Sequence, residues 1–193
     1  MFKAKSLKLK LEYATLSLIY GSILTGLGSA YYHINPYNET LFWDRLPMAI
    51  CFASVFILFI AGQMDPNLSS SHFLFYCAQF IAISSCVWWR LKDDLGPYLV
   101  IQIMPIIIFP FIRLWYPIRF NLQSLVDLSV ILYIFAKLAE VQDKFIYKVT
   151  SHTVSGHVLK HILAGITLFL MIKVAIERKV LLTLQSKNKS KKS

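Results

Sequence analysis

Two histidines four residues apart open the last long apolar run of this chain. They are His157 and His161 in "SGHVLKH", and helical residues four positions apart lie on one face. Such a pair can direct two ring nitrogens at one metal ion, with Zn–N distances of about 2.0–2.1 Å. A third histidine, His33, ends the first apolar run. Three imidazoles with an open fourth position are the ligand set of a catalytic zinc site.

Two further residues accompany the histidines and suit the same chemistry. Ser29 lies one helical turn before His33, and Asp44 opens the second apolar run, three residues before Pro47. A carboxylate that does not bind the metal can act as general base toward an attacking water, and a hydroxyl can stabilise that water or an oxyanion. Zinc would lower the pKa of the water toward ~7 and polarise a substrate carbonyl. The residues therefore predict metal-assisted hydrolysis, with Asp44 and Ser29 as catalytic residues.

The elements that must position these residues are membrane helices. The chain has 193 residues, of which 56% are hydrophobic and 16% charged, and its mean hydropathy is +0.57. That is too apolar for a soluble domain of this length. We expect an all-α, polytopic membrane bundle, one domain over 1–193 with basic tails at 1–11 and 180–193. Its six expected spans, each close to the length that crosses ~30 Å of hydrocarbon, are 12–32, 46–63, 72–91, 96–115, 122–139 and 157–177.

The alternating direction of six spans brings the candidate residues to one side of the bilayer. The first span ends at His33, the second begins near Asp44, and the sixth begins at His157 and His161. Of the 20 Lys and Arg residues, 13 fall on the side that holds both termini. The positive-inside rule then places both termini in the cytoplasm and the site near the outer or lumenal face.

The order of these motifs resembles that of the alkaline ceramidases. "SAYYH", the Asp of "WDR" and "GHVLKH" match the S-x3-H, single Asp and H-x3-H motifs of that family. The same motifs mark the wider membrane-hydrolase superfamily that includes the adiponectin and progestin receptors. The resemblance implies that His33, His157 and His161 bind zinc beside Ser29 and Asp44. It also implies hydrolysis of the linear amide bond of a ceramide-like lipid to a fatty acid and a sphingoid-type amine.

The chain departs from that family near its N-terminus. The family has seven spans and carries S-x3-H on the second, whereas this chain shows six and carries the motif on the first. Animal alkaline ceramidases have an acidic calcium-binding segment where this chain has the basic "MFKAKSLKLK". We therefore expect zinc, and not calcium, as the cofactor.

Each candidate also has a plain structural interpretation. His33 follows two tyrosines and suits an interfacial aromatic belt. Asp44 could cap a helix or pair with Arg45, and Ser29 belongs to a seam of small residues that favours close helix packing. His152 is either a partner that orients a ligand imidazole or a loop residue.

Other charged residues lie near the predicted site. Lys137, Glu140 and Asp143 end the fifth span at the same depth as the histidines and would form an ion-paired rim or hold a lipid headgroup. Asp127, deeper in that span, requires a polar partner. The three cysteines, at positions 51, 77 and 86, suggest no metal or redox motif.

Two rival functions remain open. A receptor or signalling protein would keep the zinc as a structural ligand, and a transporter would depend on Asp127.

The formal charge of +10 gathers in the terminal tails, where lysines suit anionic lipid headgroups. No basic face with interleaved aromatics exists, so we expect no nucleic-acid partner. The expected partner is a lipid substrate from the bilayer.

Overall fold

The chain folds as an all-helical bundle. The computed structural model describes residues 12–64, 71–116 and 122–190, and no strand occurs within these ranges. The long helices are α1 (Tyr13–Ile34), α2 (Asn38–Val55), α4 (His72–Lys92), α5 (Gly96–Trp115), α6 (Gln123–Val141) and α8 (Gly156–Ser190). The short elements are the π-helical turn η1 (Phe56–Ala61), α3 (Gly62–Met64) and α7 (Asp143–Val149). The expected N-terminal tail, 1–11, lies outside the described residues.

Among the described residues, four segments are long and apolar enough to cross a membrane: Asn38–Phe59, His72–Lys92, Gly96–Trp115 and Gly156–Asn188. They correspond to four of the six predicted spans, and the composition marks a membrane protein. Large apolar side chains also face outward on these helices; Phe73 is 80% exposed and Leu114 is 78% exposed. A surface of this kind suits lipid and not water.

The two remaining long helices have a mixed composition. α1 contains many Gly, Ser, Thr and Tyr residues, and α6 carries Asp127, Lys137 and Glu140. Each packs along one of the four apolar segments, since α1 lies mainly against α2 and α6 mainly against α8. Asp127 has the polar partner that an acid inside a helix bundle requires, because it pairs with Arg113 of α5.

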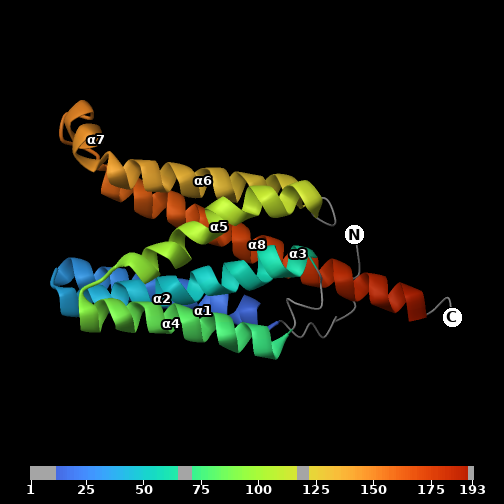
Figure 1. Ribbon diagram of the computed structural model, residues 1–193. Coiled ribbons are helices and arrows are strands. Elements are labelled where there is room, and N and C mark those ends of the chain that lie inside the picture. The colour runs from blue at the N-terminus through green and yellow to red at the C-terminus, as the bar shows by residue number, and fades with distance from the viewer. Residues whose placement is uncertain (1–11, 65–70, 117–121, 191–193) are drawn as a thin grey trace.

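The helices form two groups (Figure 1). α1, α2 and α4 lie side by side in one group, and α6 and α8 form the other. α5 starts beside α4 and crosses toward α6 and α8, while the C-terminal part of α8 extends beyond the bundle. An apolar core joins the two groups at the end of the bundle that lies away from His33. It includes Leu18, Ile57, Leu58, Val126, Met171 and Val174.

A glycine allows the closest contact between α1 and α2. A Cβ added at Gly28 would lie 2.1 Å from the carbonyl oxygen of Trp43 and 3.2 Å from Cα of Asp44. That carbonyl lacks its usual helical donor four residues on, because position 47 is a proline. The small-residue seam predicted from the sequence is thus present, and it brings the backbone beside Ser29 against the backbone beside Asp44.

Two element boundaries differ from the sequence prediction by more than a few residues. α2 begins at Asn38 and not at 46, because the polar "NET" turn forms a capping box in which the backbone N–H of Tyr37 donates to Thr40 Oγ1 at 3.1 Å. Hydropathy does not detect such a start. Asp44 therefore lies inside the helix, and its interpretation as a helix cap is wrong. α8 continues to Ser190 instead of ending at 177, so most of the expected basic tail is helical.

Candidate metal centre

The three predicted metal ligands converge at the end of the bundle. His33 lies in the last turn of α1, and His157 and His161 lie in the first two turns of α8. Their Nε2 atoms form a triangle with sides of 3.0 Å (His157–His161), 3.1 Å (His33–His157) and 3.3 Å (His33–His161). Residues 128 positions apart in the chain thus present the same ring atom to one point.

Hydrogen bonding alone cannot satisfy this triangle. In a neutral imidazole, Nε2 is either a donor or an acceptor, so at least two of the three atoms must have the same role. One contact in the triangle then joins two donors or two lone pairs. A cation that accepts a lone pair from each nitrogen satisfies all three. Tetrahedral coordination at Zn–N distances of about 2.0–2.1 Å requires ligand separations of about 3.3–3.4 Å, close to those observed.

The start of α8 is fixed by contacts with the preceding elements. The Asp143 carboxylate accepts a hydrogen bond from the backbone N–H of His157 at 2.7 Å, and Ser155 Oγ accepts one from Val158 N at 3.1 Å. A Cβ at Gly156 would lie 2.1 Å from the Ala139 carbonyl oxygen. Asp143, which the sequence placed in a charged rim, therefore acts as a cap that anchors the histidine helix against α6 and α7.

Asp44 and Ser29 lie together beside this cluster. Asp44 is only 9% exposed, and it lines the same cavity as Ser29. Arg45 does not pair with Asp44, because its guanidinium lies 4.2 Å from the ring centroid of Trp89 in a cation–π contact. The Asp44 carboxylate and the Ser29 hydroxyl thus belong to residues that line the same space as two of the histidines.

That space is a cavity of about 480 Å³, in the size range of small-molecule sites. Ser29, Asp44, His157 and His161 line one end of it. Lining residues on α8 continue to Met171, a distance of roughly 21 Å at 1.5 Å per residue. The lining away from the histidines is mainly apolar and includes Pro105, Phe109, Val130, Leu168 and Met171. The cavity therefore suits an amphiphile with its polar end at the histidines.

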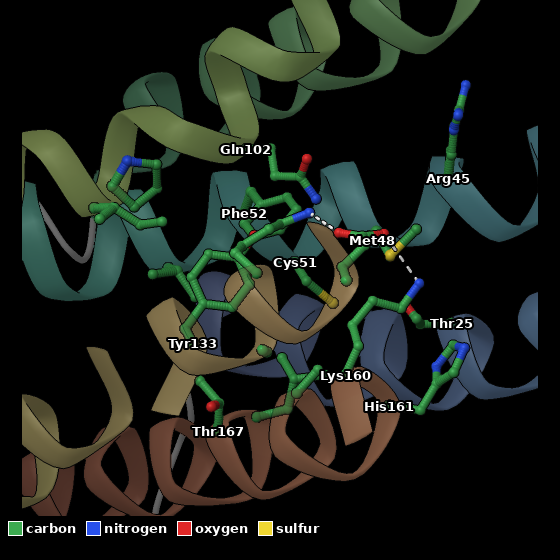
Figure 2. Close-up of a pocket in the computed structure, with 18 of the residues that line it drawn as sticks. Thr25, Arg45, Met48, Cys51, Phe52, Gln102, Tyr133, Lys160, His161 and Thr167 are labelled. Carbon is green, nitrogen blue, oxygen red and sulfur yellow. Dashed lines mark hydrogen bonds and ion pairs between the residues drawn. The ribbon is translucent and has the colours of Figure 1, made fainter. Parts of the chain in front are cut away.

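A cluster of charges lines the cavity near the histidines. Lys137 Nζ lies 2.6 Å from Glu140 Oε2, and Lys160 Nζ lies 3.1 Å from Glu140 Oε1. The ion-paired rim expected from the sequence thus exists, with Lys160 in place of Asp143. Sequence reasoning missed Lys160, although its position three residues after His157 signals the same helix face. Figure 2 shows Lys160 and His161 projecting from α8 toward the cavity.

Not every candidate joins the site. The His152 ring packs edge-on against Tyr147 at 4.9 Å between centroids, and His152 lies in a turn with a φ of 65°. Asp127 is paired with Arg113 and does not line the cavity. The three cysteines are free thiols, and two of them are buried.

Comparison with family models, curated proteins and solved structures finds no match to this chain. The function assigned to the site must therefore rest on its own residues. These are three converging imidazole nitrogens, a shielded carboxylate, and an elongated, mainly apolar cavity. Three imidazoles suit zinc best, and they also suit other transition metals.

Proposed function

We propose that this protein is a membrane-embedded, zinc-dependent hydrolase that cleaves the amide bond of a ceramide-like lipid. The observation that carries the proposal is the shared cavity. His157, His161, Asp44 and Ser29 line one end of it, while apolar side chains line the remainder. Such a cavity would hold lipid chains in its apolar part and leave the polar amide beside the groups that perform hydrolysis.

His33, His157 and His161 would hold the zinc ion. When bound, zinc supplies Lewis-acid polarisation of a carbonyl and acidification of water. Asp44 would accept a proton from the attacking water as its oxygen bonds to the amide carbon. The same carboxyl group would return that proton to the leaving nitrogen as the C–N bond breaks, giving a fatty acid and an amine. Ser29, which lines the same end of the cavity, would stabilise the attacking water or the oxyanion.

The proposal includes a membrane arrangement. All six long helices would cross the bilayer, with α1 and α6 shielded in part by their packing against α2 and α8. The excess of Lys and Arg on the side of the termini supports a cytoplasmic location for both. The cavity would then receive its lipid from the outer or lumenal leaflet. The basic end of α8 would lie against anionic headgroups.

One alternative has specific support. The three histidines come from α1 and α8, which belong to different helix groups, so a bound zinc could serve as a structural link in a receptor or signalling protein. The Asp44 carboxylate separates the two functions. A hydrolase requires it for proton transfer, and a structural link does not.

The test combines metal content and turnover on purified protein. We expect about one zinc per chain by elemental analysis, as three imidazoles imply, and fatty-acid release from N-palmitoyl-sphingosine or another N-acyl lipid in a panel. His161→Ala should lose both. Asp44→Asn should keep the zinc and lose roughly 10²-fold or more in turnover. His152→Ala is the matched control and should keep both properties.

Two results would contradict the proposal. Folded wild-type protein without metal would remove the zinc chemistry. An Asp44→Asn variant that retains zinc and hydrolyses the lipids as fast as wild type would show that the carboxylate takes no part. Zinc without release from any N-acyl lipid would favour the structural alternative.

A further inference from the structure

Two buried hydroxyl groups in the cavity have no hydrogen-bond partner within the described residues. They are the phenol oxygens of Tyr98 on α5 and Tyr133 on α6. Tyr98 is only 3% exposed, and both residues line the cavity. A buried hydroxyl without a partner costs free energy, and such groups are rare in folded proteins. The cavity must therefore hold something polar at this point.

A third polar side chain joins the two tyrosines. Gln102 lies one helical turn after Tyr98 on the same face of α5 and is 7% exposed. Gln102 and Tyr133 both line the cavity, and Gln102 does not supply a hydrogen bond of normal geometry to the Tyr133 hydroxyl. Figure 2 shows Gln102 and Tyr133 pointing into the cavity from different helices. These three side chains, which reach the cavity from α5 and α6, are called the polar patch below.

We propose that Tyr98, Gln102 and Tyr133 form a subsite for a hydroxyl group carried by the lipid substrate. This inference rests on the proposed function for the identity of the ligand as a lipid amide. A hydroxyl accepts two hydrogen bonds and donates one. The two tyrosines donate to its oxygen, and the Gln102 side-chain carbonyl accepts its proton. Both tyrosine hydroxyls and the Gln102 carbonyl oxygen then have a partner.

The subsite would make the protein selective among lipids of the same length. A buried site built to hydrogen-bond a hydroxyl discriminates against an analogue without one, because its own polar groups are then left unpaired. The favoured substrates are hydroxylated long-chain amides, and simple fatty amides should bind poorly. The groups that make this choice are distinct from those that hold the metal or move protons.

The test measures binding with ligands that no hydrolase can cleave. The probes are didodecyl ether and its derivative with one hydroxyl group on carbon 2 of one dodecyl chain, counted from the ether oxygen. Their affinities for the full-length protein in detergent are measured by displacement of a fluorescent fatty-acyl probe. Wild type should bind the hydroxylated ether about 10-fold or more tightly, since each hydrogen bond contributes ~1 kcal/mol and 1.4 kcal/mol is tenfold in affinity.

The variants assign that preference to the patch. Tyr98→Phe, Tyr133→Phe and Gln102→Leu should each reduce the preference to about 3-fold or less and leave the affinity for the plain ether unchanged. Thr167→Val is the matched control. Thr167 also lines the cavity, but its hydroxyl already donates to the Leu163 carbonyl at 2.9 Å. This variant should keep the full preference.

Equal binding of the two ethers by wild type would overturn the proposal and indicate that the patch holds only water. A preference that survives in both Tyr→Phe variants would overturn it as well. Because three separate substitutions are used, failure of one variant to fold leaves two that decide the question. The ethers contain no amide bond, so these results do not depend on whether the protein hydrolyses lipids or binds zinc.

Discussion

Replacement of Gly28 by alanine tests the contact that brings α1 against α2. The added Cβ would lie 2.1 Å from the Trp43 carbonyl oxygen. Separations below about 3 Å are not tolerated between such atoms, so the two backbones must move apart by roughly 1 Å. Overpacking of this kind costs about 1–3 kcal/mol. We expect the free energy of unfolding to fall by that amount.

The same displacement acts directly on the candidate site. Ser29 follows Gly28, and Asp44 follows Trp43, so the movement shifts these two cavity-lining residues relative to each other. A misplacement of about 1 Å costs roughly 10²-fold in rate when a reaction depends on positioning. We therefore expect fatty-acid release by Gly28→Ala to fall by about that factor.

The chain offers a closely matched control for this variant. Gly26 lies on the same helix, and a Cβ at that position meets nothing within 4 Å. Because alanine is a better helix former than glycine by up to ~1 kcal/mol, Gly26→Ala should be as stable as wild type or more stable, with unchanged turnover. Thermal unfolding in detergent and lipid hydrolysis are measured for both variants. If Gly28→Ala matched Gly26→Ala in both assays, the close contact of α1 with α2 would be refuted.

Three further outcomes are expected. His157→Ala should weaken zinc binding by roughly 10²-fold or more, since structural zinc sites gain about 10–16 kcal/mol from four ligands, while His152→Ala should bind as wild type does in the same chelator competition. Asp143→Ala should lower the free energy of unfolding by about 1–2 kcal/mol, the usual contribution of a helix cap, and Asp143→Asn, which keeps an acceptor oxygen, should lose less in the same thermal measurement. Hydrogen bonds from the backbone N–H of Gly96 and from the Trp88 indole lower the pKa of Asp94. The hydrogen bond between Trp88 and Asp94 should therefore be intact at neutral pH and be lost as the pH falls through that lowered pKa. Tryptophan fluorescence is measured against pH in wild type and in Trp88→Phe. A transition at acidic pH that is unchanged in Trp88→Phe would contradict the assignment.

The sequence was sufficient to predict which three histidines converge. The four-residue spacing of His157 and His161 places them on a common helix face. In the predicted alternation of spans, the first span ends at the level where the last span begins, and this brings His33 close to the other two histidines. These relations depend only on helical periodicity and on the alternation of spans. The convergence of the three Nε2 atoms therefore agrees with the sequence pattern.

Other parts of the site depend on packing that periodicity does not encode. Tyr98 belongs to the apolar α5 and Tyr133 to the mixed α6, and nothing in their spacing shows that α5 crosses to α6. The early start of α2 depends on hydrogen bonds at Thr40, which a hydropathy pattern does not register. Asp143 caps a helix that begins thirteen residues later, because α7 turns the chain back on itself.

The position of the histidines within the bundle separates metal binding from folding. The two helix groups are already joined at the far end by the apolar core around Leu18 and Met171. Leu18 lies about 22 Å along α1 from His33, at 1.5 Å per residue, and the cavity occupies the interval between the two ends. A metal bound by the histidines would therefore join the two helix groups at the end that the apolar core does not reach. The core joins the groups whether or not a metal is bound. For this reason we expect a single histidine variant to keep the fold, so that a loss of zinc or of turnover in that variant tests the proposed function.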